Sequence, residues 1–166
     1  MNGMIFIFSL AFVVALADAA VTDIRQFRIH NRVPLLLIAS FAAAFAVGFD
    51  SGAWLGHLGA GGALFAVGAV LFVLGVWGGG DAKMLPAVAL WTGFDGLSRF
   101  LMVMALVGGG LAVVALLARR VPLGPEGPVR AWGQRLAESG HVPYGVAIAA
   151  GGLDWWIMEM LPRVMG

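Results

Sequence analysis

The sequence contains no cysteine and very little charge. The absence of cysteine excludes disulfides, thiolate metal sites and cysteine nucleophiles. Only 11% of the residues are charged and 61% are hydrophobic, whereas an ordinary soluble domain has about 25% charged residues. We therefore expect an integral membrane protein. The net charge of +1 gives no reason to expect a nucleic-acid partner.

Metal-binding patterns are also missing. The three histidines, His30, His57 and His141, are scattered without the spacing of metal ligands. We therefore expect neither a metal ion nor another cofactor. The length of 166 residues predicts a single domain, residues 1–166.

The first apolar segment, Met4 to Leu16, is followed by Ala17-Asp18-Ala19, which imitates a signal-peptide cleavage site. A secretory signal begins with basic residues, however, and the first cation of this chain is Arg25. We interpret the segment as a retained transmembrane helix with its N-terminus outside.

Five further segments lack Asp, Glu, Lys and Arg, which gives six candidate spans and predicts an all-α polytopic membrane protein. A helix needs about 20 residues to cross the hydrocarbon core, so the fourth span is the weakest. The five segments are Pro34 to Phe49, Gly59 to Trp77, Met84 to Phe94, Phe100 to Leu117 and Val142 to Ile157.

The cations support a topology in which residues 22–33, 78–83 and 118–141 are cytoplasmic. Eight of the ten cations then lie inside, as the positive-inside rule expects. Within the last loop, residues 121–128 are rich in proline and glycine and predict a turn, and residues 130–138 predict a short amphipathic helix on the membrane surface. Glycines of the third and fifth spans, Gly61, Gly62, Gly68, Gly75 and Gly108 to Gly110, are expected to be helix-packing positions.

Two carboxylates stand at the ends of hydrophobic segments on the same predicted side. Asp23 follows the first span, and Asp81 follows three glycines in Gly78-Gly79-Gly80-Asp81-Ala82-Lys83. A charge at the membrane edge is usually functional. Two carboxyl groups that share a proton provide the base and the acid for peptide hydrolysis. The glycines are expected to allow unusual backbone dihedrals and close approach of a substrate.

Three motifs carry a family resemblance in their order along the chain. They resemble the type IV prepilin peptidase family, and most of all its short form associated with Flp-type tight-adherence pili. The motifs are Asp23 followed by basic residues and Ile29-His30-Asn31, then Gly78 to Lys83, and finally Pro143-Tyr144-Gly145-Val146-Ala147-Ile148-Ala149. One departure is His30, where the family usually has proline before the asparagine.

The resemblance implies a Gly-x-Gly-Asp aspartyl protease of the bacterial inner membrane. Its catalytic residues would be Asp23 and Asp81, with Gly78, Gly80 and Lys83 as supporting residues. It would remove the basic leader from prepilins and pseudopilins at the cytoplasmic face, while the substrate helix docks laterally among the spans in the lipid bilayer. The resemblance indicates no oligomeric state.

Other interpretations of these residues remain. Asp81 and Asp23 are also compatible with capping or juxtamembrane charges. Asp18 lies about 140° around the helix from Asp23, so we expect it to be buried, hydrogen-bonded or protonated rather than catalytic. Lys83 would orient the carboxylates or contact lipid phosphates, and Pro143-Tyr144-Gly145 is more simply the entry to a helix. The alternative function is a non-enzymatic channel or transporter subunit in which Asp18, Asp23 and Asp81 line an ion path.

Overall fold

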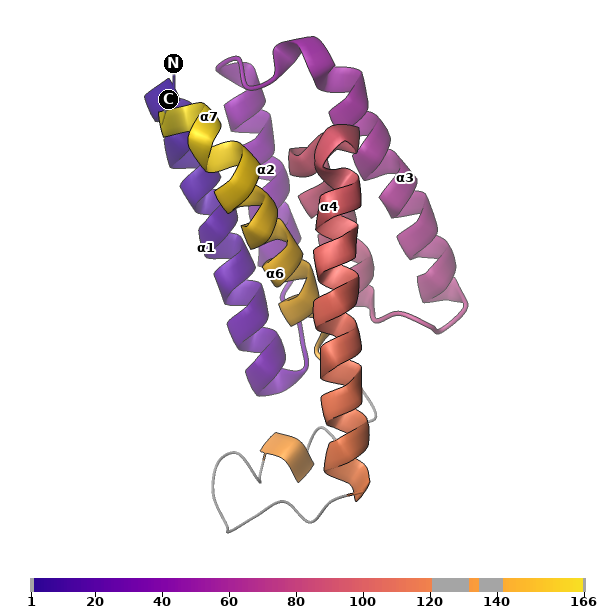
Figure 1. Cartoon of the computed structure of the whole chain (residues 1–166). Coiled ribbons are helices and arrows are strands. Elements are labelled where there is room, and N and C mark those ends of the chain that lie inside the picture. Colours follow the sequence, from indigo (N-terminus) through magenta and orange to yellow (C-terminus); the bar gives the residue numbers. More distant parts are fainter. Residues whose placement is uncertain (1, 121–131, 135–141, 166) are drawn as a thin grey trace.

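The computed structural model describes residues 2–120, 132–134 and 142–165, and all regular structure among them is helical (Figure 1). The all-α prediction is confirmed. The elements are α1 (Asn2–Gln26), α2 (Arg32–Ala46), the short 3-10 helix η1 (Ser51–Ala53), α3 (Trp54–Val73), α4 (Gly79–Arg120), α6 (Tyr144–Trp155), the π-helical turn η2 (Trp156–Met160) and α7 (Leu161–Met165).

Three helical segments in the described part of the chain are long and apolar enough to cross a membrane. They are Gly3–Gln26, Ser51–Val73 and Gly79–Leu117, and α2 is a shorter apolar helix. The chain is therefore a membrane protein with several apolar helices, as its composition predicted.

Helix α4 consists of two helices that meet at Gly93. Gly93 has φ 60° and ψ −174°, which is not helical. The first half, residues 79–92, runs antiparallel to α3, because Gly68 of α3 packs against Ala82 and Gly61 packs against Leu90. The second half, residues 94–120, turns back and runs beside α6 (Figure 1). With its two halves counted separately, and with α6, η2 and α7 as one continuous rod, the described residues form the six predicted helical rods.

The first half of α4 is short for a membrane span. At 1.5 Å per residue it is about 20 Å long, whereas the hydrocarbon core is about 30 Å thick. The sequence predicted that the fourth span is short, and in the structure this half of α4 ends at Gly93.

Helix α1 extends further than the apolar segment that predicted it. It continues to Gln26, so Asp23 lies in its last turns and not in a following loop. The helix stops at Phe27, whose φ of 51° is left-handed and whose N–H donates to the Asp23 carbonyl at 2.8 Å. The connection to α2 is therefore limited to residues 27–31, which keeps Asp23 close to Asn31.

Aromatic side chains join α1, α2, α4 and α6 in one core. The ring of Phe12 lies 5.1 Å from that of Trp91 and 5.9 Å from that of Trp155. All three rings are almost completely buried. The indole N–H of Trp91 donates to the Leu37 carbonyl at 3.0 Å, so this buried polar group is satisfied. The core fixes the helices whose ends carry the three motifs described above.

The glycine prediction is only partly confirmed. A Cβ on Gly61, Gly68 or Gly108 would touch a neighbouring helix, so these are packing positions. Gly62, Gly109 and Gly110 have open space where a Cβ would be, and for these the prediction is wrong. Gly75 is a turn residue with φ 71°.

The predicted turn at 121–128 lies outside the described residues, as does most of the predicted surface helix at 130–138. Within that segment the structure describes Trp132 to Gln134, which are helical. The indole N–H of Trp132 donates to the Ile24 carbonyl at 2.9 Å, next to Asp23.

Candidate active site

The two predicted aspartates line one cavity of about 460 Å³. It lies where α1 ends and where α4 and α6 begin. The prediction that Asp23 and Asp81 lie on the same side of the bundle is confirmed. The lining residues are Asp23, Phe27, Arg28, Ile29, Asn31, Gly78, Gly79, Gly80, Asp81, Lys83 and Val142.

Asp23 is buried, with 5% of its surface exposed, and it is fixed by the start of α6. The backbone N–H of Gly145 donates to its Oδ2 atom at 2.7 Å. The free N–H groups in the first turn of a helix favour a negative group in this position. Pro143 is the N-cap of α6, so the predicted helix-entry role of Pro143-Tyr144-Gly145 is confirmed. The contact with Asp23 was not foreseen.

Gly145 also allows a close approach that a larger residue would prevent. A Cβ on Gly145 would lie 2.8 Å from Asp23 Oδ2 and 2.8 Å from Ile29 Cδ1. Real Cβ atoms essentially never come so close to their neighbours. Gly145 of the third sequence motif therefore contributes to the site because it has no side chain that would displace Asp23 or Ile29.

Asp81 lies in the first turn of α4 and is partly buried. Its Oδ2 atom would be 3.3 Å from a Cβ on Gly78, and a Cβ on Gly80 would be 3.0 Å from Ile29 Cβ. Gly80 thus lets the start of α4 pack against the loop after α1, and Gly78 leaves room for the Asp81 side chain. The expectation of unusual dihedrals is wrong here, because the glycines with positive φ among the described residues are Gly48, Gly75 and Gly93.

Lys83 contacts an amide side chain at the edge of the cavity. Its Nζ donates to Asn31 Oδ1 at 3.2 Å, and both residues are exposed. Asn31 belongs to the first motif and Lys83 to the second. The hydrogen bond therefore joins α4 to the start of α2 directly beside the two aspartates.

Asp18 lies outside the cavity and forms an ion pair. Arg32 of α2 donates to both of its carboxylate oxygens, with Nε 2.9 Å from Oδ2 and Nη2 2.7 Å from Oδ1. The expected hydrogen bonding of Asp18 is confirmed, but its side chain is 31% exposed and not buried. Its pairing with a guanidinium matches a charged, structural carboxylate.

His30 occupies the position where the resembled family usually has proline. Its Nδ1 atom is buried without a hydrogen-bond partner in the described part of the chain. His57 lies elsewhere, with Nδ1 2.8 Å from the Leu90 carbonyl and Nε2 3.3 Å from Asp50. No group of three or more His, Cys, Asp or Glu side chains that could hold a metal is present among the described residues.

The fold and the cavity define a polytopic membrane protein that carries two carboxylates in one cavity of about 460 Å³. The chain belongs to the type IV leader peptidase family, whose model matches residues 10–113. It is therefore a peptidase of that family. The match contains Asp23 and Asp81, whereas Gly145 lies beyond it. No match was found among curated proteins or among solved structures.

Proposed function

We propose that this peptidase is an aspartic endopeptidase in which Asp23 and Asp81 form the catalytic pair. The observation that carries the proposal is that both carboxylates line one cavity although they come from separate helices. The proposal also has support from Gly145, which holds one oxygen of Asp23 by a backbone hydrogen bond.

In the proposed mechanism one aspartate is charged and the other is protonated. The charged carboxylate takes a proton from a water molecule as the water oxygen attacks the peptide carbonyl carbon. The protonated carboxyl donates its proton to the carbonyl oxygen. When the tetrahedral intermediate collapses, the C–N bond breaks and the leaving amine takes the proton from one carboxyl, while the other carboxylate takes a proton from a hydroxyl of the intermediate, so that the carbonyl re-forms and the pair again holds one proton.

The Gly145 contact restricts the route of the proton at Asp23. A backbone N–H only donates, so Asp23 Oδ2 acts as the acceptor in the 2.7 Å hydrogen bond. The backbone of Val146 also interacts with the Asp23 carboxylate, so we propose that Asp23 exchanges protons with water or with Asp81 on the side that faces away from these two backbone groups. Lys83 and Asn31 border the same cavity and would position the substrate backbone.

For the substrate we propose prepilins and pseudopilins of the Flp type, cut at the cytoplasmic face of the inner membrane. The support is the ordered set of three motifs and the family membership. The cation distribution supports the orientation, because the cavity lies at the end that carries Arg25, Arg28, Arg32 and Lys83. The channel alternative has less support, because Asp18 is paired with Arg32 away from Asp23 and Asp81.

The test is processing of a prepilin from the same organism, co-expressed with the peptidase in a host that lacks such enzymes. We expect conversion to the mature form, with the new N-terminus established by mass spectrometry. Asp81→Asn should abolish conversion. The matched control is Asp95→Asn, an exposed carboxylate early in the second half of α4, and it should process normally. Full conversion by Asp81→Asn would refute the aspartic mechanism, and no conversion by the wild type would refute the substrate.

A further inference from the structure

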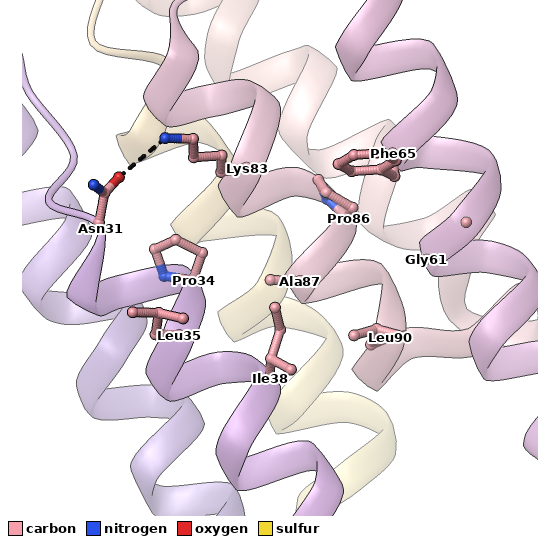
Figure 2. A pocket seen from close by; sticks show the side chains of 11 residues that line it. Asn31, Pro34, Leu35, Ile38, Gly61, Phe65, Lys83, Pro86, Ala87 and Leu90 are labelled. Carbon is pink, nitrogen blue, oxygen red and sulfur yellow. Dashed lines mark hydrogen bonds between the residues drawn. The ribbon is translucent and has the colours of Figure 1, made fainter.

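A second cavity of about 570 Å³ lies between α2, α3 and the first half of α4 (Figure 2). Its walls are almost entirely apolar. Figure 2 shows side chains of α2 on one side and Phe65 and Gly61 of α3 on the other, with Pro86, Ala87 and Leu90 of α4 between them. We call this cavity the apolar groove. Its lining residues are Asn31, Pro34, Leu35, Ile38, Gly61, Gly62, Phe65, Lys83, Pro86, Ala87 and Leu90.

The apolar groove is continuous with the cavity of the two aspartates. Asn31 and Lys83 line both. The hydrogen bond between them, 3.2 Å long, lies at one end of the groove (Figure 2). A chain segment that lies in the groove and extends past this hydrogen bond therefore reaches Asp23 and Asp81.

The groove opens toward the region that lipid would occupy. Leu35 is 66% exposed, Phe65 61% and Ile38 45%, and all three belong to helices that contribute to the groove. From Lys83 to Leu90 the helix rises about 10 Å. The groove is thus long enough for about two turns of an added helix.

The charge of the lining indicates which part of a prepilin, the basic leader or the hydrophobic helix, binds in the groove. The lining contains no acidic residue and has one cation, Lys83, at its inner end. A basic leader would find no counter-charge in it, whereas an apolar helix would bury its side chains against apolar walls. The aspartates and Arg28 line only the neighbouring cavity.

We propose that the apolar groove binds the first two turns of the hydrophobic helix that follows the cleaved bond. This proposal rests on the proposed function and adds the place where the substrate helix docks. The substrate enters sideways from the bilayer, and its cleavage site passes Asn31 and Lys83 to reach the carboxylates. The leader then remains on the polar side of these two residues.

Gly62 provides a test that does not disturb the empty enzyme. A Cβ at Gly62 meets no atom within 4 Å, and Gly62 lines the groove. Gly62→Leu would therefore fill the groove from one wall while the helices stay in place. The matched control is Gly109→Leu in α4, where a Cβ also meets no atom within 4 Å and which lines neither cavity.

The measurement is prepilin processing per amount of membrane-inserted enzyme at several substrate levels. Gly62→Leu should raise KM by about tenfold or more, because the added side chain occupies the space of the substrate helix, whereas Gly109→Leu should match the wild type. Equal KM values for both variants would overturn the proposal. If the wild type cleaves no prepilin at all, the proposed function fails and not merely the docking site.

Site-specific crosslinking gives a second readout that does not depend on turnover. A photoreactive residue at Leu35, in the groove, should form an adduct with the prepilin, and mass spectrometry should locate it within the first two turns of the hydrophobic segment. The same residue at Leu106, which is 70% exposed on α4, should not. Adducts from Leu35 with lipid alone, or with a second copy of the enzyme, would overturn the proposal.

Discussion

Gly145 and Asp23 are 122 residues apart in the chain and are joined by a 2.7 Å hydrogen bond from a backbone N–H to a carboxylate oxygen. The contact unites the last motif of the sequence with the first. It also explains why glycine stands at position 145, since a Cβ there would lie 2.8 Å from the same oxygen.

Gly145→Ala should therefore impair the enzyme. Helix propensity alone would make alanine more stable than glycine by up to about 1 kcal/mol, so a loss of activity has to come from displacement of Asp23 or Ile29. We expect a fall in prepilin processing of at least about tenfold per amount of inserted enzyme. Gly109→Ala, an open helical position, is the control. Normal turnover by Gly145→Ala would show that the contact with Asp23 does not matter for the reaction.

Asp23→Asn and Asp81→Asn should each abolish cleavage while the protein remains inserted. Asparagine preserves the shape but cannot exchange the proton, which typically contributes about 10² to 10⁴-fold per group. The losses should not add, because the two residues act as one unit. Processing by the double variant should equal that of the worse single variant. If the amount of protein in the membrane fell together with the activity, the aspartates would instead have a structural role.

Asp18→Asn should retain substantial activity. The Asp18 carboxylate accepts two hydrogen bonds from Arg32 and lies outside the cavity. Because Arg32 is 67% exposed, the ion pair is screened by solvent and its loss should lower stability only slightly. Thermal unfolding in detergent and prepilin processing are to be measured on the same preparation. If Asp18→Asn were inactive and Asp23→Asn were active, the first catalytic residue would be Asp18 and not Asp23.

Gly93→Ala should destabilise the protein. The dihedrals of Gly93, φ 60° and ψ −174°, lie in a region that is essentially reserved for glycine, and a residue forced into such a region costs about 1 to 3 kcal/mol. The added Cβ would also lie 3.1 Å from the His57 ring. Chemical unfolding in detergent should show this loss. Gly110→Ala, in open helical space, should be neutral or slightly stabilising, and an unfolding midpoint of Gly93→Ala at or above that of Gly110→Ala would contradict the expectation.

The orientation is testable because the chain lacks cysteine. Ser51 and Gln26 are both exposed and lie toward opposite ends of the bundle. A membrane-impermeant thiol reagent should label Ser51→Cys in intact cells and Gln26→Cys only after permeabilisation. The reverse pattern would place the two aspartates outside.

The sequence predicted the helical class and the approximate spans, because charge is so costly inside a bilayer that uncharged segments reveal the helices. It also predicted that Asp23 and Asp81 lie on one side. It did not predict that α1 continues through Asp23 to Gln26, because charged residues are tolerated in a helix where it leaves the membrane. Hydropathy therefore placed the end of this helix too early.

Long-range contacts escaped prediction for a different reason. The pairing of Arg32 with Asp18, and that of Lys83 with Asn31, depend on which helix faces meet. A single sequence carries no direct signal for such contacts between helix faces. The one usable signal was Gly145, since a glycine at the second position of a helix permits close approach of another element. As a motif of the resembled family and as the entry to a helix, Gly145 carries no prediction of the contact with Asp23.

The short first half of α4 has a consequence for the bilayer itself. It ends at Gly93 after about 20 Å, and one wall of the apolar groove is made from it. A hydrophobic helix shorter than the surrounding hydrocarbon is accommodated by local thinning of the membrane. Thinning of the membrane around the first half of α4 brings interfacial water closer to Asp81. This matters because hydrolysis consumes a water molecule in every turnover. We therefore expect lipid chain length to affect the rate of this peptidase, with thicker bilayers slowing it even when the substrate sequence is unchanged.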